Sequence, residues 1–274
     1  MDKNKASLIF HNLLVKSVKR TTDPYDKVAL LLSGGVDSLG ILFCLQELGK
    51  EIQPYTFYLE NTKSPDLAMS RKVSKMYGYD LIEIPIPRET IKEDIINLIQ
   101  NYNCKTKVAI ETNIHMLHTF PKIKEKVVTS GLFSGTLLGT AKYEVIAYRN
   151  DPKGFNENRQ KVFDNYDNYD LGFLKQFSKE YDVKISVPYW DKDILRFMLM
   201  FDHNYLNKPY QKWIIINGFK NKFKQTGIRK EKPYQIGSGM RRYCETFLND
   251  PEFNFNNRKR MLDVYRDLVK KYET

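Results

Sequence analysis

Short apolar runs alternate along the chain with longer segments in which apolar residues recur every three or four positions. The run from Val28 to Leu32 contains no polar residue, which is typical of a strand buried in a parallel sheet. Similar short runs predict strands at 52–59, 81–86, 126–129 and 183–187. Segments with helical periodicity or helix boundary residues predict helices at 7–19, 38–48, 66–77, 89–100, 108–120, 171–181, 191–201, 209–223, 240–248 and 258–272.

Strands separated by helices favour an α/β fold, here a doubly wound parallel sheet of five strands. We expect a single domain over residues 1–274, with a core at about 27–200 and a helical C-terminal part at about 201–274. The segment 150–168, which is rich in Asn and Asp, predicts an exposed excursion or lid. In such sheets ligands bind at the carboxyl ends of the strands, so the loops that follow the strands are the place to look for a site.

The loop after the first strand combines small residues with one carboxylate. It reads Ser33-Gly34-Gly35-Val36-Asp37-Ser38 and leads into the predicted helix 38–48. A strand, a glycine turn and a helix N-terminus form an anion site, because free backbone N–H groups and the helix dipole both favour negative charge. The two glycines allow close approach of a phosphate, the two serines add hydroxyl donors, and Asp37 can hold Mg²⁺. The alternative is an ordinary strand-to-helix turn.

A second glycine-rich loop follows the predicted strand 126–129. It reads Ser130-Gly131-Leu132-Phe133-Ser134-Gly135-Thr136-Leu137-Leu138-Gly139-Thr140. Because both glycine-rich loops follow predicted parallel strands, we expect both at the same edge of the sheet.

Lys and Arg outnumber Asp and Glu by 44 to 33, which gives a net charge of +11. This charge suits a polyanionic partner such as nucleic acid. The alternative is a general richness in Lys, which is spread along the whole chain and is dense only at 220–224 and 229–232.

The cysteines and histidines do not form a recognisable metal or disulfide pattern. Cys44, Cys104 and Cys244 lie far apart in the sequence, which favours neither a disulfide framework nor a zinc site. His115 and His118 are one helical turn apart, but two ligands without a third favour an ordinary helix face. No apolar stretch has the length of a signal peptide or a membrane span, so we expect a cytoplasmic protein with no membrane partner.

The loop 33–38 resembles the pyrophosphate loop of the ATP pyrophosphatase superfamily, also called the PP-loop or adenine nucleotide alpha hydrolase superfamily. Later stretches, in matching order over about 28–240, resemble the synthetase domain of asparagine synthetase and of its relative β-lactam synthetase, without the glutaminase domain. These stretches are Ser64-Pro65-Asp66-Leu67-Ala68, Val127-Val128-Thr129-Ser130-Gly131, Val187-Pro188-Tyr189-Trp190-Asp191, and Lys212-Trp213-Ile214-Ile215 followed by the run 229–232.

The resemblance implies an adenine nucleotide alpha hydrolase-like fold that uses ATP and Mg²⁺. Enzymes of this kind cleave ATP between its α and β phosphates, adenylate a substrate carboxylate, and form an amide when an amine or ammonia displaces AMP. The nucleotide-binding residues implied for this chain are Leu32, Ser33, Gly34, Gly35, Val36, Asp37, Ser38, Tyr58, Ser130 and Gly131, with Asp37 holding Mg²⁺.

The resemblance also implies a late lysine that stabilises negative charge on the phosphates or on the tetrahedral intermediate. Lys232 is the first choice for this role and Lys230 the second, and the alternative for both is a solvated surface lysine. Asp191 either orients the substrate or caps the helix that starts beside it.

The second loop departs from the asparagine synthetase pattern, which reads Gly-Glu-Gly-x-Asp-Glu. Leu132 stands at the position of the catalytic Glu, and Gly135 stands at the position of the second magnesium-binding Asp. Either another acid such as Glu144, Glu60 or Asp191 supplies the role, or the nucleophile needs no base, or catalysis has been lost.

Three functions follow from these observations. The first is an AMP-forming ligase or amidotransferase that acts on a small carboxylate with free ammonia, a substrate amine or a separate amide donor protein. The second is a PP-loop enzyme that modifies tRNA or a DNA base, which the net charge favours. The third is a catalytically silent ATP-binding relative, which the missing acids favour.

Overall fold

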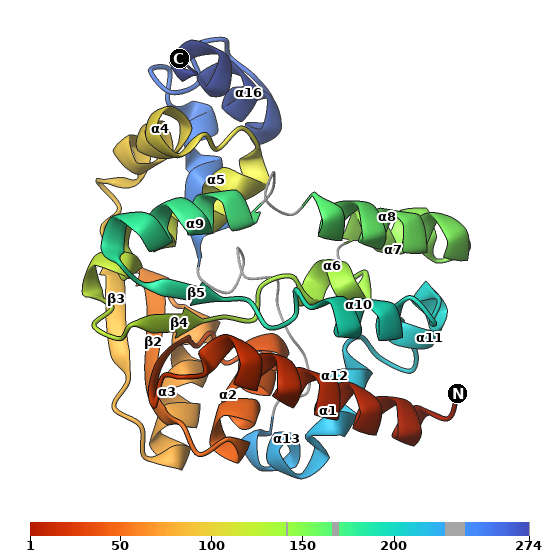
Figure 1. The fold of residues 1–274 in the computed structure, drawn as a ribbon. Helices are drawn as coiled ribbons and strands as arrows, with labels where there is room; N and C mark the ends of the chain where they lie inside the picture. The colour runs from red at the N-terminus through yellow and green to blue at the C-terminus, as the bar shows by residue number, and fades with distance from the viewer. Residues whose placement is uncertain (141, 166–169, 228–238, 274) are drawn as a thin grey trace. The chain divides into compact units, whose positions relative to one another are not determined.

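The computed structural model of the chain contains a five-stranded parallel sheet with the strand order β3-β2-β1-β4-β5 (Figure 1). The structure describes residues 1–140, 142–165, 170–227 and 239–273. The strands are β1 (Lys27–Leu31), β2 (Glu51–Leu59), β3 (Ile82–Ile86), β4 (Val127–Thr129) and β5 (Lys184–Ser186). The predicted α/β fold with five parallel strands is therefore confirmed.

Helices connect and flank these strands. They are α1 (Lys3–Thr22), α2 (Val36–Glu47), α3 (Pro65–Tyr77), α4 (Ile91–Tyr102), α5 (Lys107–Thr119), α6 (Ser134–Leu138), α7 (Lys142–Tyr148), α8 (Pro152–Asp164), α9 (Asp170–Tyr181), α10 (Lys192–Met198), α11 (His203–Asn207), α12 (Trp213–Gly218), α13 (Lys220–Thr226), α15 (Met240–Cys244) and α16 (Met261–Tyr272), with 3-10 turns η1 (Phe120–Lys122) and η3 (Glu245–Asn249). No helix in the described ranges is long and apolar enough to cross a membrane.

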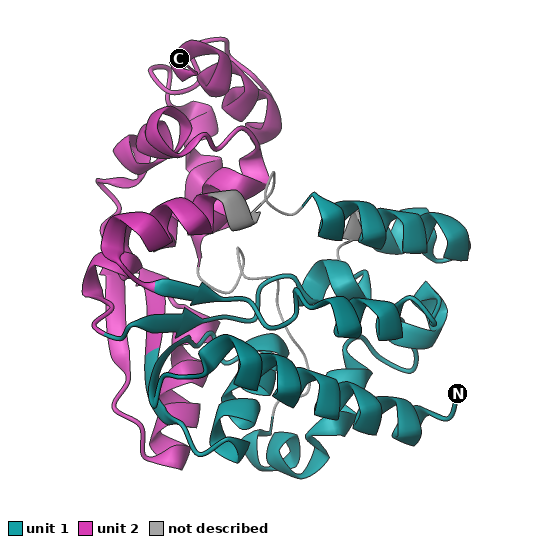
Figure 2. Cartoon of the chain, viewed as in Figure 1, with its two compact units in different colours: residues 1–54, 125–166, 184–231 teal, residues 55–124, 167–183, 232–274 magenta. Residues whose placement is uncertain are grey.

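The contacts within the chain group into two compact units (Figure 2). Unit 1 comprises residues 1–54, 125–166 and 184–231, and unit 2 comprises residues 55–124, 167–183 and 232–274. The strands β1, β4 and β5 fall in unit 1, β3 falls in unit 2, and β2 crosses the division. The expectation of a single domain stays a prediction.

In unit 1 the long helix α1 packs against α2 and α12. The Asp2 side chain caps α1 by accepting hydrogen bonds from the backbone N–H groups of Asn4 and Lys5. The helix buries Phe10, Leu14 and Val18 at helical spacing, so an amphipathic stripe holds it in place.

In unit 2 the helices α4, α5 and α16 pack against one another. Their apolar faces include Ile95, Ile114 and Leu268, each almost completely buried. Helix α3, also in unit 2, is capped at its start by Ser64, which accepts a hydrogen bond from the Leu67 N–H, and it ends at Gly78 in the left-handed conformation.

Two local predictions were wrong. The polar segment 150–168 contains the helix α8, which starts at the capping residue Asp151 and buries Phe155, Arg159 and Phe163 along one face. The Arg159 guanidinium is fully buried and donates to the carbonyls of Leu137 and Phe201. A narrow stripe of one residue per turn therefore anchors a segment whose overall composition is polar.

The predicted helix 209–223 is divided into α12 and α13. Lys212 precedes α12 with a left-handed backbone (φ 62°), and Phe219 separates the two helices with a non-helical conformation. Pro209 therefore lies before the helical segment and does not open it.

A buried histidine in unit 2 makes stability depend on pH. His115 is 5% exposed and stacks on Phe57 with ring centroids 3.9 Å apart. Burial, assisted by the nearby His118, lowers the pKa of His115 to about 3. The imidazole is therefore neutral in the folded chain throughout the neutral and mildly acidic range.

We expect this histidine to weaken the fold as the pH falls. In the unfolded chain His115 takes up a proton below its ordinary pKa of about 6.5, so its contribution is complete above that pH and is lost as the pH falls towards 3. Relative to a His115→Gln variant, the free energy of unfolding of the parent should fall more steeply by up to about 1.4 kcal/mol per pH unit below pH 6.5. Urea unfolding from pH 4.5 to 8.5 measures this difference, and parallel curves over the whole range would contradict it.

Candidate functional site

The strand order reverses between β1 and β4, and this reversal creates the crevice where ligands bind in open parallel sheets. The chain runs outward from β1 through β2 to β3, then returns to the other side of β1 to form β4 and β5. β1 and β4 pair with Ala29 opposite Val128 and Leu30 opposite Thr129. The two glycine-rich loops follow these two strands, so both lie at the reversal point within unit 1.

The first loop turns sharply into α2. Gly34 adopts a left-handed backbone (φ 72°), and Gly35 is the N-cap of α2 and has no side chain to cap the helix. Ser33 and Ser38 hold the turn together, because their Oγ atoms lie 3.2 Å apart and the Ser38 hydroxyl donates to the Gly35 carbonyl at 3.1 Å. The Gly35 N–H donates to the Ser33 Oγ at 3.3 Å, and the N-cap position of α2 carries no capping side chain of its own.

Asp37 lies in the first turn of α2 and is the centre of charge at this site. Its Oδ2 accepts a hydrogen bond from the Lys212 ammonium at 2.6 Å. Its Oδ1 is buried and has no hydrogen-bond partner among the described residues. A buried carboxylate oxygen without a donor is a suitable ligand for a hard cation, so the residues present fit Mg²⁺.

The described residues contain no cluster of three or more His, Cys, Asp or Glu side chains able to hold a metal ion. An ion at Asp37 would therefore take its other ligands from phosphate oxygens and water, as Mg²⁺ commonly does in nucleotide sites. His115 and His118 both lie on α5 in unit 2, and His118 contacts Asp94 at 2.8 Å.

The second loop closes over the first at Gly131. A Cβ atom on Gly131 would lie 2.7 Å from the Asp37 Cβ and 2.9 Å from both the Asp37 carbonyl carbon and the Ser38 nitrogen. These are backbone and near-backbone atoms, so they cannot move aside as the end of a flexible side chain could. The neighbouring Ser130 is 7% exposed and donates its N–H to the Ser186 carbonyl of β5.

The other nucleotide-binding predictions fall in different places. Leu32 is buried (1% exposed) directly before the first loop, and Val36 is the first residue of α2. Tyr58 lies on β2 in unit 2. Lys230 and Lys232, the two candidate catalytic lysines, lie outside the described residues.

Asp191 is held entirely by structural contacts. Its carboxylate accepts hydrogen bonds from the N–H groups of Asp193 and Ile194 at the start of α10 and forms an ion pair with Arg20 of α1. The capping interpretation therefore describes what this side chain does in the structure.

Two residues at the site were not assigned a role from the sequence. Lys212 belongs to a stretch that resembles a family motif, but nothing in that stretch shows that its ammonium reaches Asp37, which is 175 positions earlier. The Tyr189 side chain is fully buried, and its hydroxyl donates to the Asp37 carbonyl at 3.1 Å. The segment after β5 therefore supports the first turn of α2 directly.

The second loop lacks the family's carboxylates at Leu132 and Gly135, and the two candidate acids of unit 1, Glu144 and Asp191, are engaged elsewhere. Residues 134–138 form α6, which starts after Phe133 in a left-handed conformation (φ 72°). Glu144 is 1% exposed and interacts electrostatically with the buried Arg159. Asp191 is engaged as described above, and Glu60 belongs to unit 2.

Comparisons with known proteins place this geometry in context. A protein-family model described as asparagine synthase matches residues 10–152, which is about half of the chain. No curated protein sequence matches the chain.

Similar solved structures include two archaeal proteins. One is a predicted subunit of a tRNA methyltransferase from Methanocaldococcus jannaschii, with 12% identity and a TM-score of 0.36 over 73% of this chain and 88% of that one. The other is the U34-tRNA thiolase NcsA from Methanococcus maripaludis with its 4Fe–4S cluster, with 15% identity and a TM-score of 0.41 over 100% of this chain and 83% of that one.

The packing of the two loops predicts the effect of one methyl group. Gly131→Ala should lower the free energy of unfolding by about 1–3 kcal/mol, because the added Cβ meets backbone atoms of Asp37 and Ser38. Gly135→Ala is the matched control in the same loop, since its Cβ would lie 3.5 Å from the Thr140 hydroxyl, an ordinary contact, and should leave stability unchanged or raise it by up to about 1 kcal/mol because Ala favours the helix α6. Urea unfolding of both variants tests this, and equal losses would show that the loops do not abut at Gly131.

Proposed function

The chain belongs to the asparagine synthase family, and we propose that it is an ATP-dependent ligase that adenylates a substrate carboxylate and releases pyrophosphate and AMP. The observation that carries this proposal is the environment of Asp37. One of its carboxylate oxygens accepts from Lys212, and the other is buried without a hydrogen-bond partner among the described residues. This arrangement lies at the start of an uncapped helix, where phosphate groups bind best.

The first loop would hold the pyrophosphate part of ATP. The N–H groups of Gly34, Gly35 and Val36 and the hydroxyls of Ser33 and Ser38 would supply the donors, and the Gly35 N–H and the Ser38 hydroxyl would exchange their present partners within the loop for phosphate oxygens. Within unit 1, Leu32, Ser130 and Gly131 are proposed to border the adenine and ribose, while the role of Tyr58, which belongs to unit 2, stays a prediction. Gly131 must stay small in this role. A side chain there would meet Asp37 and fill the space between the two loops.

The Lys212 ammonium and a cation held by Asp37 would offset the negative charge of the leaving pyrophosphate. The Asp37 carboxylate would hold Mg²⁺, which would supply charge stabilisation to the phosphates. The Lys212 ammonium, 2.6 Å from Asp37, then lies where a preorganised cation can stabilise the departing pyrophosphate. Lys232, with Lys230 as the second choice, is proposed for charge stabilisation on the side of the acyl intermediate.

The second half of the reaction would be amide formation. Neither Leu132 nor Gly135 can act as a base, and within unit 1 Glu144 and Asp191 are engaged in other contacts. We therefore propose a nucleophile that arrives as a free amine or ammonia, from a substrate amine or a separate amide donor protein. A nucleophile that is already neutral needs no carboxylate in the second loop.

A second candidate function keeps the same nucleotide chemistry but acts on nucleic acid. The observation that favours it is the net charge of +11, which attracts a polyanion. Adenylation of a base oxygen in tRNA or DNA would also release pyrophosphate, so the stimulating substrate separates the two candidates. A catalytically silent relative would bind ATP without releasing pyrophosphate.

The test is release of pyrophosphate and AMP from ATP with Mg²⁺, screened with carboxylates plus ammonium and then with tRNA and DNA. Asp37→Asn should reduce the rate by at least about a hundredfold, because the amide keeps the shape but removes the charge that holds the cation. Asp26→Asn is the matched control, since Asp26 is exposed beside the amino end of β1, opposite the loops, and its loss should leave the rate unchanged.

Each outcome decides between the candidates. Stimulation by a carboxylate with ammonium supports the ligase, and stimulation by tRNA or DNA supports the nucleic-acid enzyme. Production of ADP and phosphate contradicts cleavage at the α-phosphorus. Bound ATP without any release identifies a silent relative.

A further inference from the structure

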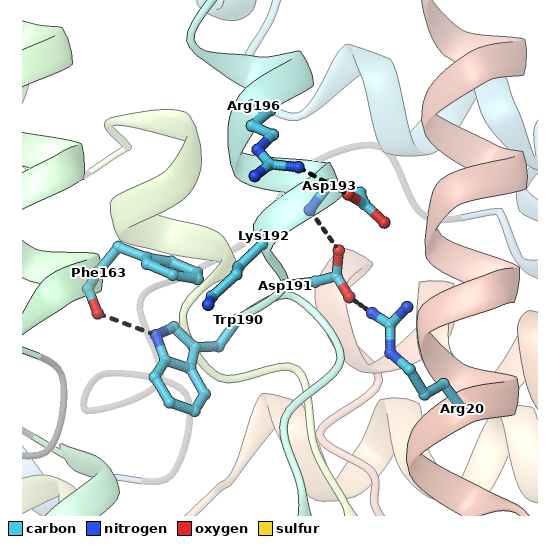
Figure 3. Close-up of a pocket in the computed structure, with 7 residues that line it drawn as sticks. All are labelled: Arg20, Phe163, Trp190, Asp191, Lys192, Asp193 and Arg196. Atoms are coloured by element: carbon cyan, nitrogen blue, oxygen red, sulfur yellow. Dashed lines mark hydrogen bonds and ion pairs between the residues drawn. The ribbon is translucent and has the colours of Figure 1, made fainter.

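A pocket of about 400 Å³ lies on unit 1 between the C-terminal part of α1, the end of α8 and the beginning of α10 (Figure 3). Its volume is within the range of sites that hold small molecules or single groups of larger ones. It contains no residue of either glycine-rich loop, so the proposed ATP chemistry does not account for it.

One side of the pocket is a fixed aromatic wall. Trp190 and Phe163 have ring centroids 5.4 Å apart and planes inclined at 38°. The indole N–H of Trp190 donates to the Phe163 carbonyl at 3.2 Å, so the polar edge of the ring is already satisfied (Figure 3). Phe163 is buried and Trp190 is half-buried, which leaves part of the wall available for a planar group to stack.

The carboxylates of the pocket are already engaged. Asp191 pairs with Arg20 and accepts from two backbone N–H groups of α10. Asp193 lies 3.6 Å from Arg196. These contacts neutralise the two acids, so neither carboxylate attracts a cationic ligand strongly.

Lys192 is the charged residue of the pocket that makes no ion pair with another described residue. Its side chain is exposed, points towards Trp190 and Phe163, and has no hydrogen bond or ion pair among the described residues (Figure 3). The lining carries three cations and two carboxylates, which leaves one net positive charge beside the aromatic wall.

We propose that this pocket binds a ligand that carries a planar ring and an anionic group, the ring against Trp190 and Phe163 and the anion at Lys192. Two kinds of molecule carry both groups: a free aromatic acid, and a single nucleotide of a nucleic-acid strand. The net charge of +11 makes the second source attractive, because the rest of a strand would also be drawn to the chain. Binding does not depend on ATP.

The fluorescence of Trp190 can report on this pocket directly. The chain has two tryptophans, and the other, Trp213, is completely buried and donates to the Tyr205 carbonyl. In a Trp213→Phe background, titration with benzoate should quench or shift the remaining emission. Benzylamine, which has the same ring and the opposite charge, should bind at least about threefold more weakly. Calorimetry on the parent protein gives the same comparison if the Trp213→Phe variant folds poorly.

Substitutions separate this pocket from ordinary surface attraction. Lys192→Gln should weaken benzoate binding by about threefold, and Trp190→Leu, measured by calorimetry, by about tenfold. Lys16→Gln is the matched control, because Lys16 is an exposed lysine on α1 outside the pocket lining and its loss should have no effect. Asp37→Asn should also leave benzoate binding unchanged, which distinguishes this pocket from the proposed ATP site.

A uridine hexamer identifies the source of the ligand. Binding of the hexamer that is tighter than that of benzoate and falls with Lys192→Gln and Trp190→Leu supports a nucleotide in a strand, and benzoate binding alone supports a free aromatic acid. The proposal is overturned if neither probe binds, if benzylamine binds as well as benzoate, or if Lys16→Gln weakens binding as much as Lys192→Gln.

Discussion

The site depends on the close approach of two loops at the reversal of strand order, where Gly131 packs directly on the first turn of α2. No side chain fits between Gly131 and the backbone of Asp37 and Ser38. The pairing of β1 with β4 brings the two loops together, and the absence of a side chain at Gly131 lets them touch. The N-terminus of α2, which has no capping side chain, and the carboxylate of Asp37 therefore lie against the second loop.

Charge at the crevice is arranged around the same residue. Asp37 is supported from three segments, since Lys212 contacts its carboxylate, Tyr189 contacts its carbonyl and Gly131 packs against its Cβ. An acid with one paired oxygen and one unpaired buried oxygen is costly unless a cation completes it. We regard this cost as the reason why the site suits a nucleotide that brings Mg²⁺ with it.

The sequence predicted those features that are encoded locally. The apolar run before Ser33 predicted β1, and the glycines after it predicted the turn, because strand burial and left-handed backbone depend on the residues themselves. Contacts between distant segments left no local pattern, so the approach of Lys212 to Asp37 and of Arg20 to Asp191 could not be predicted. The helix α8 was missed because its core-facing stripe includes a buried arginine within a polar stretch. The roles of Lys230 and Lys232 stay predictions.

In the proposed site the Asp37 carboxylate holds a divalent cation together with the pyrophosphate group. The most direct test replaces Mg²⁺ by Mn²⁺ and follows its electron paramagnetic resonance signal in the presence of pyrophosphate. The parent protein should immobilise Mn²⁺ when pyrophosphate is present, and Asp37→Asn should not. Equal immobilisation by both proteins would contradict the assignment of the metal to Asp37, and with it the proposed site.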